Sequence, residues 1–382
     1  MRILSLLSNF TETLSVASIS KYFSFRTFVS LILSAIFFSC ANTGKPPKIK
    51  TENEPASLIS SVDSSKFLRF NNIHSIYKDS RGNIWIGSHS DGIAMWDGKL
   101  HTYFSTPDGL VDNQVRSIQE DKLGNIWIAT GHGISIFTGD EFRIRLNMKD
   151  WNNSITSDVW ESNPNDLWFH AGNKPGVYRF DGQHLNYLAF PTDQNETVND
   201  VYLNTCFAKG QNNQIWFGTY PAVFGFDREI FSSINNESLG LNGQNEYMHV
   251  RSIFEDSRGN LWIGNNGLGL LLYDGEGIVN FTKKHKLTNE HFTIHNLVSD
   301  DTGTLARIFS IEEDLDGNLW FGTADAGVWK YDGQNLKNYN SSHGFEDHFI
   351  KVIYCDNDGD MWFGTQSGVY QRSGKERFSR VF

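Results

Sequence analysis

The sequence predicts an all-β protein, a seven-bladed β-propeller with four antiparallel strands in each blade. A short turn followed by tryptophan recurs seven times, with 41 to 58 residues between successive tryptophans. A period of this length, with strand-like segments on both sides, is typical of propeller blades. Aromatic residues make up 14% of the chain, which suits sheets packed face to face. The seven tryptophans are Trp85, Trp127, Trp168, Trp216, Trp262, Trp320 and Trp362.

The fifth repeat shows how one repeat gives four strands. Residues Val250 to Phe254 alternate apolar and polar side chains, which predicts the first strand. The second strand is predicted at Leu261 to Gly264 and the third at Gly269 to Tyr273, before an Asp-Gly turn. Residues Ile278 to Phe281 complete the blade as its fourth strand.

The turn before each tryptophan has a recurring chemistry. Aspartate stands six positions before tryptophan in five repeats, where its carboxylate can accept backbone N–H groups across the turn. Glycine stands three positions before tryptophan in the same five repeats, and Asn165 and Asn213 replace it in the others. We therefore expect a left-handed backbone there in all seven repeats. The run Asp356 to Asp360 resembles the start of a calcium loop, but the closing glutamate is missing and hairpin geometry alone explains the turn.

The first 64 residues differ from the repeats. The apolar stretch Phe28 to Phe38 is too short to span a bilayer and suits the core of a signal peptide. A small residue precedes Cys40, which resembles the lipobox of bacterial lipoproteins and implies lipidation of Cys40. Plain signal-peptidase cleavage and a retained anchor are the alternatives. We predict a lipoprotein-like signal peptide at 1–40, a flexible tether at 41–64 and the propeller at 65–382. The protein is expected to be exported, periplasmic or at the cell surface, with a lipid anchor in a bacterial membrane.

Charge and cysteine content exclude several classes of protein. The formal net charge of −11 argues against a nucleic-acid or anionic-membrane surface. Cys206 and Cys355 fall on predicted inner strands across the ring from each other, too far apart for a disulfide, so both are expected to be buried free thiols. Motifs for nucleotide binding, nucleophilic catalysis and redox chemistry are missing from the sequence, so we predict no cofactor and name no catalytic residue.

Candidate ligand-binding residues come from one face of the ring. Propeller geometry places the loops after each second strand, and the starts of the inner strands, around the mouth of the central channel, where ligands usually bind. Several inner strands carry a basic residue eleven positions before tryptophan, which suggests a locally positive mouth. The predicted ligand-binding residues are His74, His89, Arg116, His132, His170, Lys174, Tyr220, Arg251, Asn265, Asn266, Asp325 and Lys351. Solvated strand ends that take any polar residue are the alternative interpretation.

A longer step separates the fifth and sixth repeats. The inserted residues 283–304 contain His291 and His295, which would share one face of a helix. A third metal ligand is not apparent, so a metal site stays unassigned and a solvated loop over the mouth is the simpler interpretation.

The repeat resembles the two-component regulator propeller family. The shared pattern is an apolar residue, then Ile-x-Glu-Asp-x-x-Gly-Asn-Leu-Trp-Ile-Gly-Thr and later Tyr-Asp-Gly, and it is most complete in Val250 to Gly275 and Ile308 to Gly333. Residues Phe104 to Ile118 are similar to the linker between blades of that family. In the family, such rings form the periplasmic sensor halves of membrane histidine kinases. Because these residues account for one ring, the resemblance implies a ligand-binding module.

The expected ligand is a glycan or another polyhydroxylated or anionic small molecule, bound at the channel mouth by a monomer. A membrane protein is a further candidate partner. Streptogramin lyases are broadly similar seven-bladed propellers, so the alternative is an enzyme that uses a mouth histidine and a divalent ion. A scaffold for another protein is the third interpretation. Enzymatic activity is left open, with binding preferred.

Overall fold

The computed structural model describes residues 70–149, 159–191, 203–241, 247–288, 303–374 and 376–382. Contacts divide the chain into units Met1–Ser60 and Ser61–Phe382, and all described residues belong to the second unit. The predicted signal peptide, the tether, Cys40, His291 and His295 lie outside the described residues.

The described residues form seven antiparallel blades. Blade one contains β1 (Ile73–Lys78), β2 (Ile84–Ser88), β3 (Ile93–Trp96) and β4 (His101–Phe104), and blade two contains β5 (Val115–Glu120), β6 (Ile126–Thr130), β7 (Gly133–Phe137) and β8 (Phe142–Asn147). Blade three contains β9 (Leu167–His170), β10 (Gly176–Phe180) and β11 (Leu185–Ala189), and blade four contains β12 (Leu203–Lys209), β13 (Ile215–Thr219), β14 (Ala222–Phe226) and β15 (Phe231–Asn235).

The remaining blades follow the same order. Blade five contains β16 (Val250–Glu255), β17 (Leu261–Asn265), β18 (Leu270–Tyr273) and β19 (Ile278–Asn280), followed by the short helix α1 (Phe281–Lys284). Blade six contains β20 (Ile308–Glu313), β21 (Leu319–Thr323), β22 (Val328–Tyr331) and β23 (Leu336–Tyr339). Blade seven contains β24 (Ile350–Cys355), β25 (Met361–Thr365), β26 (Val369–Arg372) and β27 (Phe378–Arg380). Single 3₁₀ turns are η2 (Thr106–Asp108), η4 (Gln211–Asn213) and η5 (Ser341–His343).

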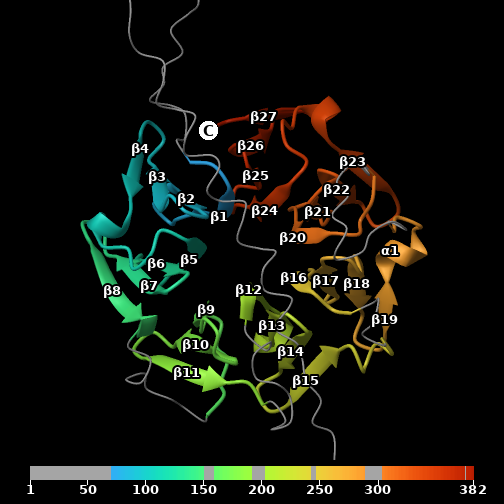
Figure 1. Ribbon diagram of the computed structural model, residues 1–382, viewed down its shortest axis with the longest axis horizontal. Coiled ribbons are helices and arrows are strands. Elements are labelled where there is room, and N and C mark those ends of the chain that lie inside the picture. Colours follow the sequence, from blue (N-terminus) through green and yellow to red (C-terminus); the bar gives the residue numbers. More distant parts are fainter. Residues whose placement is uncertain (1–69, 150–158, 192–202, 242–246, 289–302, 375) are drawn as a thin grey trace, which may run out of the picture. The chain divides into compact units, whose positions relative to one another are not determined.

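The blades follow one another around a ring in sequence order, as the colours in Figure 1 show. Six blades have four strands, and the three described strands of blade three correspond to its outer three. The inner strands carry the side chains of the channel, because they lie nearest to the centre of the ring. The predicted seven-bladed architecture is therefore confirmed.

The turn aspartates accept more hydrogen bonds than the sequence predicts. In blade one, Oδ1 of Asp79 accepts the backbone N–H groups of Arg81 (3.0 Å) and Asn83 (2.8 Å), as expected. Oδ2 of Asp79 also accepts the indole N–H of Trp85 at 2.9 Å. The same indole bond recurs with Asp121, Asp256, Asp314 and Asp356. Each aspartate thus fixes both the turn and the buried tryptophan that follows it.

Blades three and four build this turn differently. Asn213 has the expected positive φ of 63°, but Asn165 is absent from the positive-φ residues of the described chain, so the prediction of a left-handed backbone there is wrong. In blade three, Asp166 instead accepts the backbone N–H of Asn163 (2.8 Å) and Nε of Arg179 (2.7 Å). This buried pair closes the turn without a left-handed residue.

Blade four has Gly210 where five other blades have aspartate. A Cβ atom at this position would overlap the carboxylate of Glu255, which comes from blade five. That carboxylate accepts the indole N–H of Trp216 at 2.7 Å and the backbone N–H of Gln211 at 2.7 Å. A neighbouring blade therefore supplies the carboxylate that this blade lacks.

Glutamates on the inner strands also connect other neighbouring blades. Glu120 of blade two accepts the backbone N–H (2.8 Å) and hydroxyl (2.5 Å) of Ser80 in blade one. Glu313 of blade six does the same for Ser257 of blade five, at 2.7 Å in both bonds. Each carboxylate thus caps the turn of the preceding blade.

Blades one and seven meet through a different pair. Lys78 occupies the position that corresponds to Glu120, and its ammonium lies 2.9 Å from Asp356 and 2.5 Å from Asp358 of blade seven. At this seam the cation lies on the inner strand of blade one and the anions lie on the turn of blade seven. In the glutamate contacts, by contrast, the anion lies on the inner strand.

The glycine two residues after tryptophan allows neighbouring blades to approach. A Cβ atom at Gly87 would overlap Val115 of the next blade. The corresponding pairs are Gly264 with Ile308, Gly322 with Ile350 and, across the seam, Gly364 with Ile73. The ring is therefore closed by the same packing that joins other neighbours.

The outermost strand of blade seven is β27, which pairs with β26, so the C-terminal strand completes this blade. Phe382 packs between Trp362 of blade seven (5.9 Å between ring centroids) and Trp96 of blade one (5.0 Å). Phe70, the first described residue, also packs in the core at this seam.

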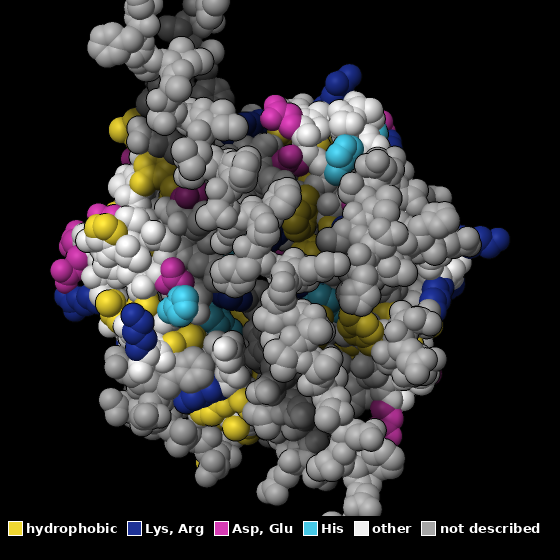
Figure 2. All heavy atoms as spheres, viewed as in Figure 1, with side chains coloured by type: hydrophobic (Ala, Val, Ile, Leu, Met, Phe, Trp, Pro, Cys, Tyr) yellow, Lys and Arg dark blue, Asp and Glu magenta, His cyan; other side chains and the backbone are white. Residues whose placement is uncertain are grey.

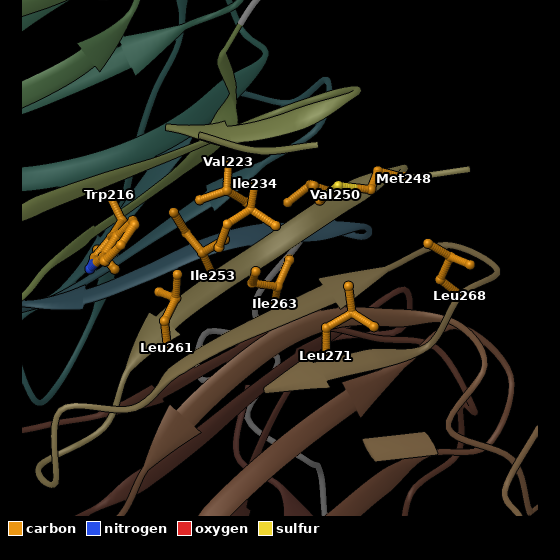
Figure 3. Packing of buried hydrophobic residues seen from close by; sticks show 11 residues of the cluster. Trp216, Val223, Ile234, Met248, Val250, Ile253, Leu261, Ile263, Leu268 and Leu271 are labelled. Atoms are coloured by element: carbon orange, nitrogen blue, oxygen red, sulfur yellow. The ribbon is translucent and has the colours of Figure 1, made fainter. Parts of the chain in front are cut away.

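Apolar layers between blades form the core. Figure 3 shows the layer between blades four and five, where Val223 and Ile234 face Val250 and Ile263. Similar clusters lie between other neighbouring blades. The inner strands are thus held rigidly enough to present fixed side chains to the channel.

Candidate functional site

A cavity of about 300 Å³ lies at the channel, and the second residue of five inner strands lines it. These residues stand eleven positions before the tryptophan of their blade. Among the described residues, the lining consists of His74, His89, Gln114, Arg116, Arg251, Phe309 and Lys351. Histidine and basic side chains also lie side by side near the middle of the face in Figure 2. Five of the twelve predicted ligand-binding residues therefore share one cavity.

Polar contacts connect blades seven, one and two around this cavity. The ammonium of Lys351 donates to Oδ1 of Asn72 at 3.2 Å and to Nε2 of His74. The ring centroids of His74 and His89 lie 4.7 Å apart. Because Lys351 donates to Nε2 of His74, the proton of the neutral imidazole is on Nδ1.

The same chain of contacts continues into blade two. Nε2 of Gln114 donates to Nδ1 of His89 at 3.2 Å, and Oε1 of Gln114 accepts from Nη2 of Arg116 at 3.1 Å. Gln114 thus orients the imidazole of His89 and the guanidinium of Arg116 together.

The charged groups of the cavity are all basic. Burial, followed by the charge of Lys351, lowers the pKa of His74 to about 3. Burial, followed by the charges of Arg251 and Arg116, lowers the pKa of Lys351 to about 8. Burial also lowers the pKa of His89. The described lining contains no carboxylate, so a positive cavity lies within a protein of net charge −11.

Aromatic rings form one wall of the cavity. The guanidinium of Arg251 lies over the ring of Phe309 at 5.4 Å. Phe309 packs edge-to-face on Phe349, with 4.9 Å between the centroids, and Lys351 lies 5.6 Å from the Phe349 ring. The wall therefore combines an apolar surface with two cations.

Sequence reasoning missed the residue two positions before three of the cavity residues, His74, Arg116 and Lys351. Asn72, Gln114 and Phe349 stand thirteen positions before tryptophan and contact the cavity residues directly. Side chains two positions apart on a strand share a face, so the sequence could have placed these residues beside the cavity residues.

Three other predicted residues lie between blades five and six. Nε of Arg307 donates to Oδ1 of Asn266 at 3.0 Å, and its Nη1 lies 3.6 Å from the carboxylate of Asp325. Asn265 is fully buried, and its Oδ1 accepts the backbone N–H of His249 at 3.2 Å. Asn265 and Asp325 are thus buried in contacts of the fold, and Arg307 was not predicted.

His170 is buried rather than exposed at the mouth. Its Nδ1 accepts the backbone N–H of Gly172 at 3.2 Å, so Nε2 carries the proton and donates to the Thr130 carbonyl of blade two at 2.8 Å. Burial lowers the pKa of His170 to about 3. The expectation of a ligand contact is corrected to a neutral interior histidine that joins two blades.

The last three predicted residues are outside the lining of this cavity. His132 is exposed and its Nδ1 lies 2.7 Å from Asp112. Lys174 lies 5.1 Å from the ring of Tyr187, and Tyr220 packs on His249 with 4.1 Å between centroids. His132 thus belongs to a local pair in blade two, Lys174 to one in blade three, and Tyr220 to one between blades four and five.

Within the described ranges, no group of three or more His, Cys, Asp or Glu is arranged to hold a metal ion. None of the helices in this part of the chain is long and apolar enough to cross a membrane. Cys206 and Cys355 lie on the inner strands β12 and β24 as predicted, and Cys355 is free but half-buried rather than buried.

Comparison with known proteins identifies the repeat. The profile of the two component regulator propeller family matches residues 68–90, 109–132, 245–267 and 344–367. No curated protein sequence matches this chain.

Solved structures share the fold at low sequence identity. The extracellular domain of a hybrid two component system of B. thetaiotaomicron is 21% identical, with a TM-score of 0.55 over 79% of this chain. The match covers 38% of that longer domain. Virginiamycin B lyase from Staphylococcus aureus, crystallised with quinupristin, is 15% identical with a TM-score of 0.54, over 80% of this chain and 94% of the lyase.

Proposed function

We propose that this chain, which is built of two component regulator propeller repeats, is a sensor-like ligand-binding module that works outside the cytoplasm. The observation that carries the proposal is the convergence of His74, Arg116, Arg251, Phe309 and Lys351 on one cavity. These side chains come from five blades, and burial together with neighbouring cations lowers the pKa of His74 and of Lys351. Perturbed ionisable groups gathered in a cavity are typical of functional sites.

The ligand is a glycan or another small molecule with several polar groups. A cavity of about 300 Å³ is at the lower end of the size of small-molecule sites, roughly 300–1,000 Å³. Its donors can satisfy hydroxyl or acidic oxygens, while Phe309 offers an apolar surface to the ligand ring. Binding through a few polar groups beside an aromatic wall is the usual design of such sites.

Export and membrane attachment are part of the proposal. The similar structure from B. thetaiotaomicron is an extracellular domain, and the apolar stretch before Cys40 has the character of a signal peptide. A lipid on Cys40 would hold the module at a membrane, where a membrane protein could respond to the bound ligand.

A glycan-array screen of the purified propeller, with and without EDTA, tests this function. We expect saturable binding without product formation, and loss of that binding in the double variant Arg116→Ala/Arg251→Ala. The control Lys122→Ala/Arg145→Ala removes two exposed cations outside the cavity and should bind like the parent protein. Metal-dependent product formation would instead support the lyase-like alternative, and unchanged binding by the arginine variant would reject the cavity as the site.

A further inference from the structure

The charge of the cavity restricts the class of ligand, an inference that rests on the proposed function. Arg116, Arg251 and Lys351 reach the cavity from blades two, five and seven. Arg116 and Arg251 both act on Lys351 as repelling charges. Repulsion between partly buried cations costs free energy in the empty protein, and a bound anion would remove that cost.

The type of side chain indicates which anion fits. A guanidinium presents its donors in a planar fork that matches two oxygens of one carboxylate, sulfate or phosphate group. Gln114 fixes the orientation of Arg116, and the ring of Phe309 lies below Arg251. Both guanidinium groups are therefore held in place, which favours a directional contact over a diffuse attraction.

We propose that the cavity binds a small acidic molecule through an oxyanion, with Arg116 and Arg251 at its oxygens, Lys351 as a third cation and Phe309 against its carbon skeleton. Acidic sugars combine these features, since they carry a carboxylate, sulfate or phosphate ester on a ring with an apolar face. A neutral sugar would leave the three cations uncompensated and binds more weakly.

Oxyanion binding is coupled to a proton on Lys351. The groups that face this ammonium are Asn72 and His74 on blade one, Arg116 on blade two and Arg251 on blade five, with His89 beyond His74. Asp112 acts on His89 rather than on Lys351. Among the described residues no carboxylate acts on Lys351, so a bound anion would be the nearest negative charge there and would raise the pKa of Lys351 from about 8 in the empty protein.

The sign of the pH effect follows from this shift. Below about pH 8, Lys351 is charged with or without ligand, so affinity is constant. Above that pH, binding takes up one proton and affinity falls up to about tenfold per pH unit. Removal of the titrating group by Lys351→Gln should make affinity independent of pH between 7 and 9.

Isothermal titration calorimetry of the propeller tests the inference with four probes: galacturonate, galactose 6-sulfate, galactose 6-phosphate and neutral galactose. At least one acidic probe should bind about 30-fold or more tightly than galactose, and the Arg116→Ala/Arg251→Ala variant should lose that preference. The comparison of the three acidic probes identifies which oxyanion is preferred. The Lys122→Ala/Arg145→Ala control should retain the preference.

Three outcomes would overturn the inference. If galactose binds as tightly as the acidic probes and the arginine variant loses both, the cavity is a neutral-sugar site, and only the proposed function survives. If an acidic probe binds the arginine variant as well as the parent, the oxyanion lies elsewhere. If neither these probes nor any glycan of the array binds, the proposed function fails together with the inference.

Discussion

At the scale of single residues, one carboxylate does two things in five of the blades. It closes a turn through backbone N–H groups and holds the indole of a buried tryptophan, as Asp256 does for Trp262. Burial alone would raise the pKa of Asp121 and Asp314, but hydrogen bonds from the indole and turn groups lower both values. The recurring aspartate is therefore a structural residue.

Truncation of a core tryptophan should separate fold residues from cavity residues. Trp262 is 3% exposed and packs on Phe281 and Phe321, so Trp262→Ala should cost about 3–5 kcal/mol of unfolding free energy. Arg116→Ala/Arg251→Ala should leave the melting temperature unchanged or slightly raised, because it removes cations that repel Lys351. Chemical denaturation of both variants measures the difference, and an equal loss would mean that the arginines belong to the fold.

The interior His170 predicts a loss of stability in mild acid. Its folded pKa of about 3 is below the ordinary 6.5, so its stabilising contribution is complete above pH 6.5 and is lost as pH falls towards 3. Between pH 6.5 and 5 the loss is about 2 kcal/mol, at about 1.4 kcal/mol per pH unit. Unfolding free energies at several pH values should fall less steeply in His170→Gln. Identical slopes would show that His170 titrates normally.

Gly210 predicts a non-additive pair of substitutions. Gly210→Ala should destabilise the protein, because its new Cβ would collide with the carboxylate of Glu255. In the background Glu255→Ala the same change should cost much less, since the colliding group is gone. A double-mutant cycle measured by urea unfolding gives the coupling, which we expect at about 1 kcal/mol or more. Additive effects would contradict the inference that the Glu255 carboxylate takes the place of the aspartate that blade four lacks.

At the scale of elements, the sequence predicts the strands and turns, which depend on nearby residues, and misses the contacts between blades. The four strands of blade five lie within a few residues of their predicted positions, because alternation and turn residues act over short distances. His170 and Asn265 were assigned to the mouth because they stand at strand ends, but packing between blades turns their side chains inward. Arg307 was missed because only the folded ring brings Asn266 of blade five to it.

The last strand predicts a contrast between the two ends of the propeller. Phe378 and Phe382 are each 4% exposed, so deletion of Phe378 to Phe382 should cost at least about 3–5 kcal/mol. Removal of residues 1–64 should leave the melting temperature unchanged, since the core clusters of the described residues begin at Phe70. Thermal unfolding of the two truncations makes the comparison. A greater loss from the N-terminal deletion would contradict closure by β27.

At the scale of the whole molecule, the contact between the first and last blades closes the ring. The seam between blades one and seven combines the packing of Gly364 on Ile73, the ion pairs of Lys78 and the insertion of Phe382. These contacts hold the channel side chains of blades seven and one together, including Lys351 and His74. Closure of the ring and assembly of the cavity are therefore coupled.

Attachment to the membrane is tested at Cys40. If Cys40 carries a lipid, palmitate labelling in bacterial cells should be lost in Cys40→Ser and the protein should appear in the soluble fraction. The unlabelled propeller should still bind its ligand, because the cavity residues begin at His74. Unchanged labelling or membrane retention would reject the lipoprotein prediction.

The reversed charges of the seam have a consequence for assembly. If blade two followed blade seven in the ring, Glu120 of blade two would meet Asp358 of blade seven, and like charges would repel. In the same way, Lys78 would meet Arg258 in place of Asp358 if blade one followed blade five, and like charges would again repel. The charges of this seam thus favour blade seven over blade five as the partner of blade one, whereas blade six offers an aspartate, Asp316, at the position of Asp358. The charges at the two ends of the propeller therefore oppose closure of blade one on blade five and of blade two on blade seven.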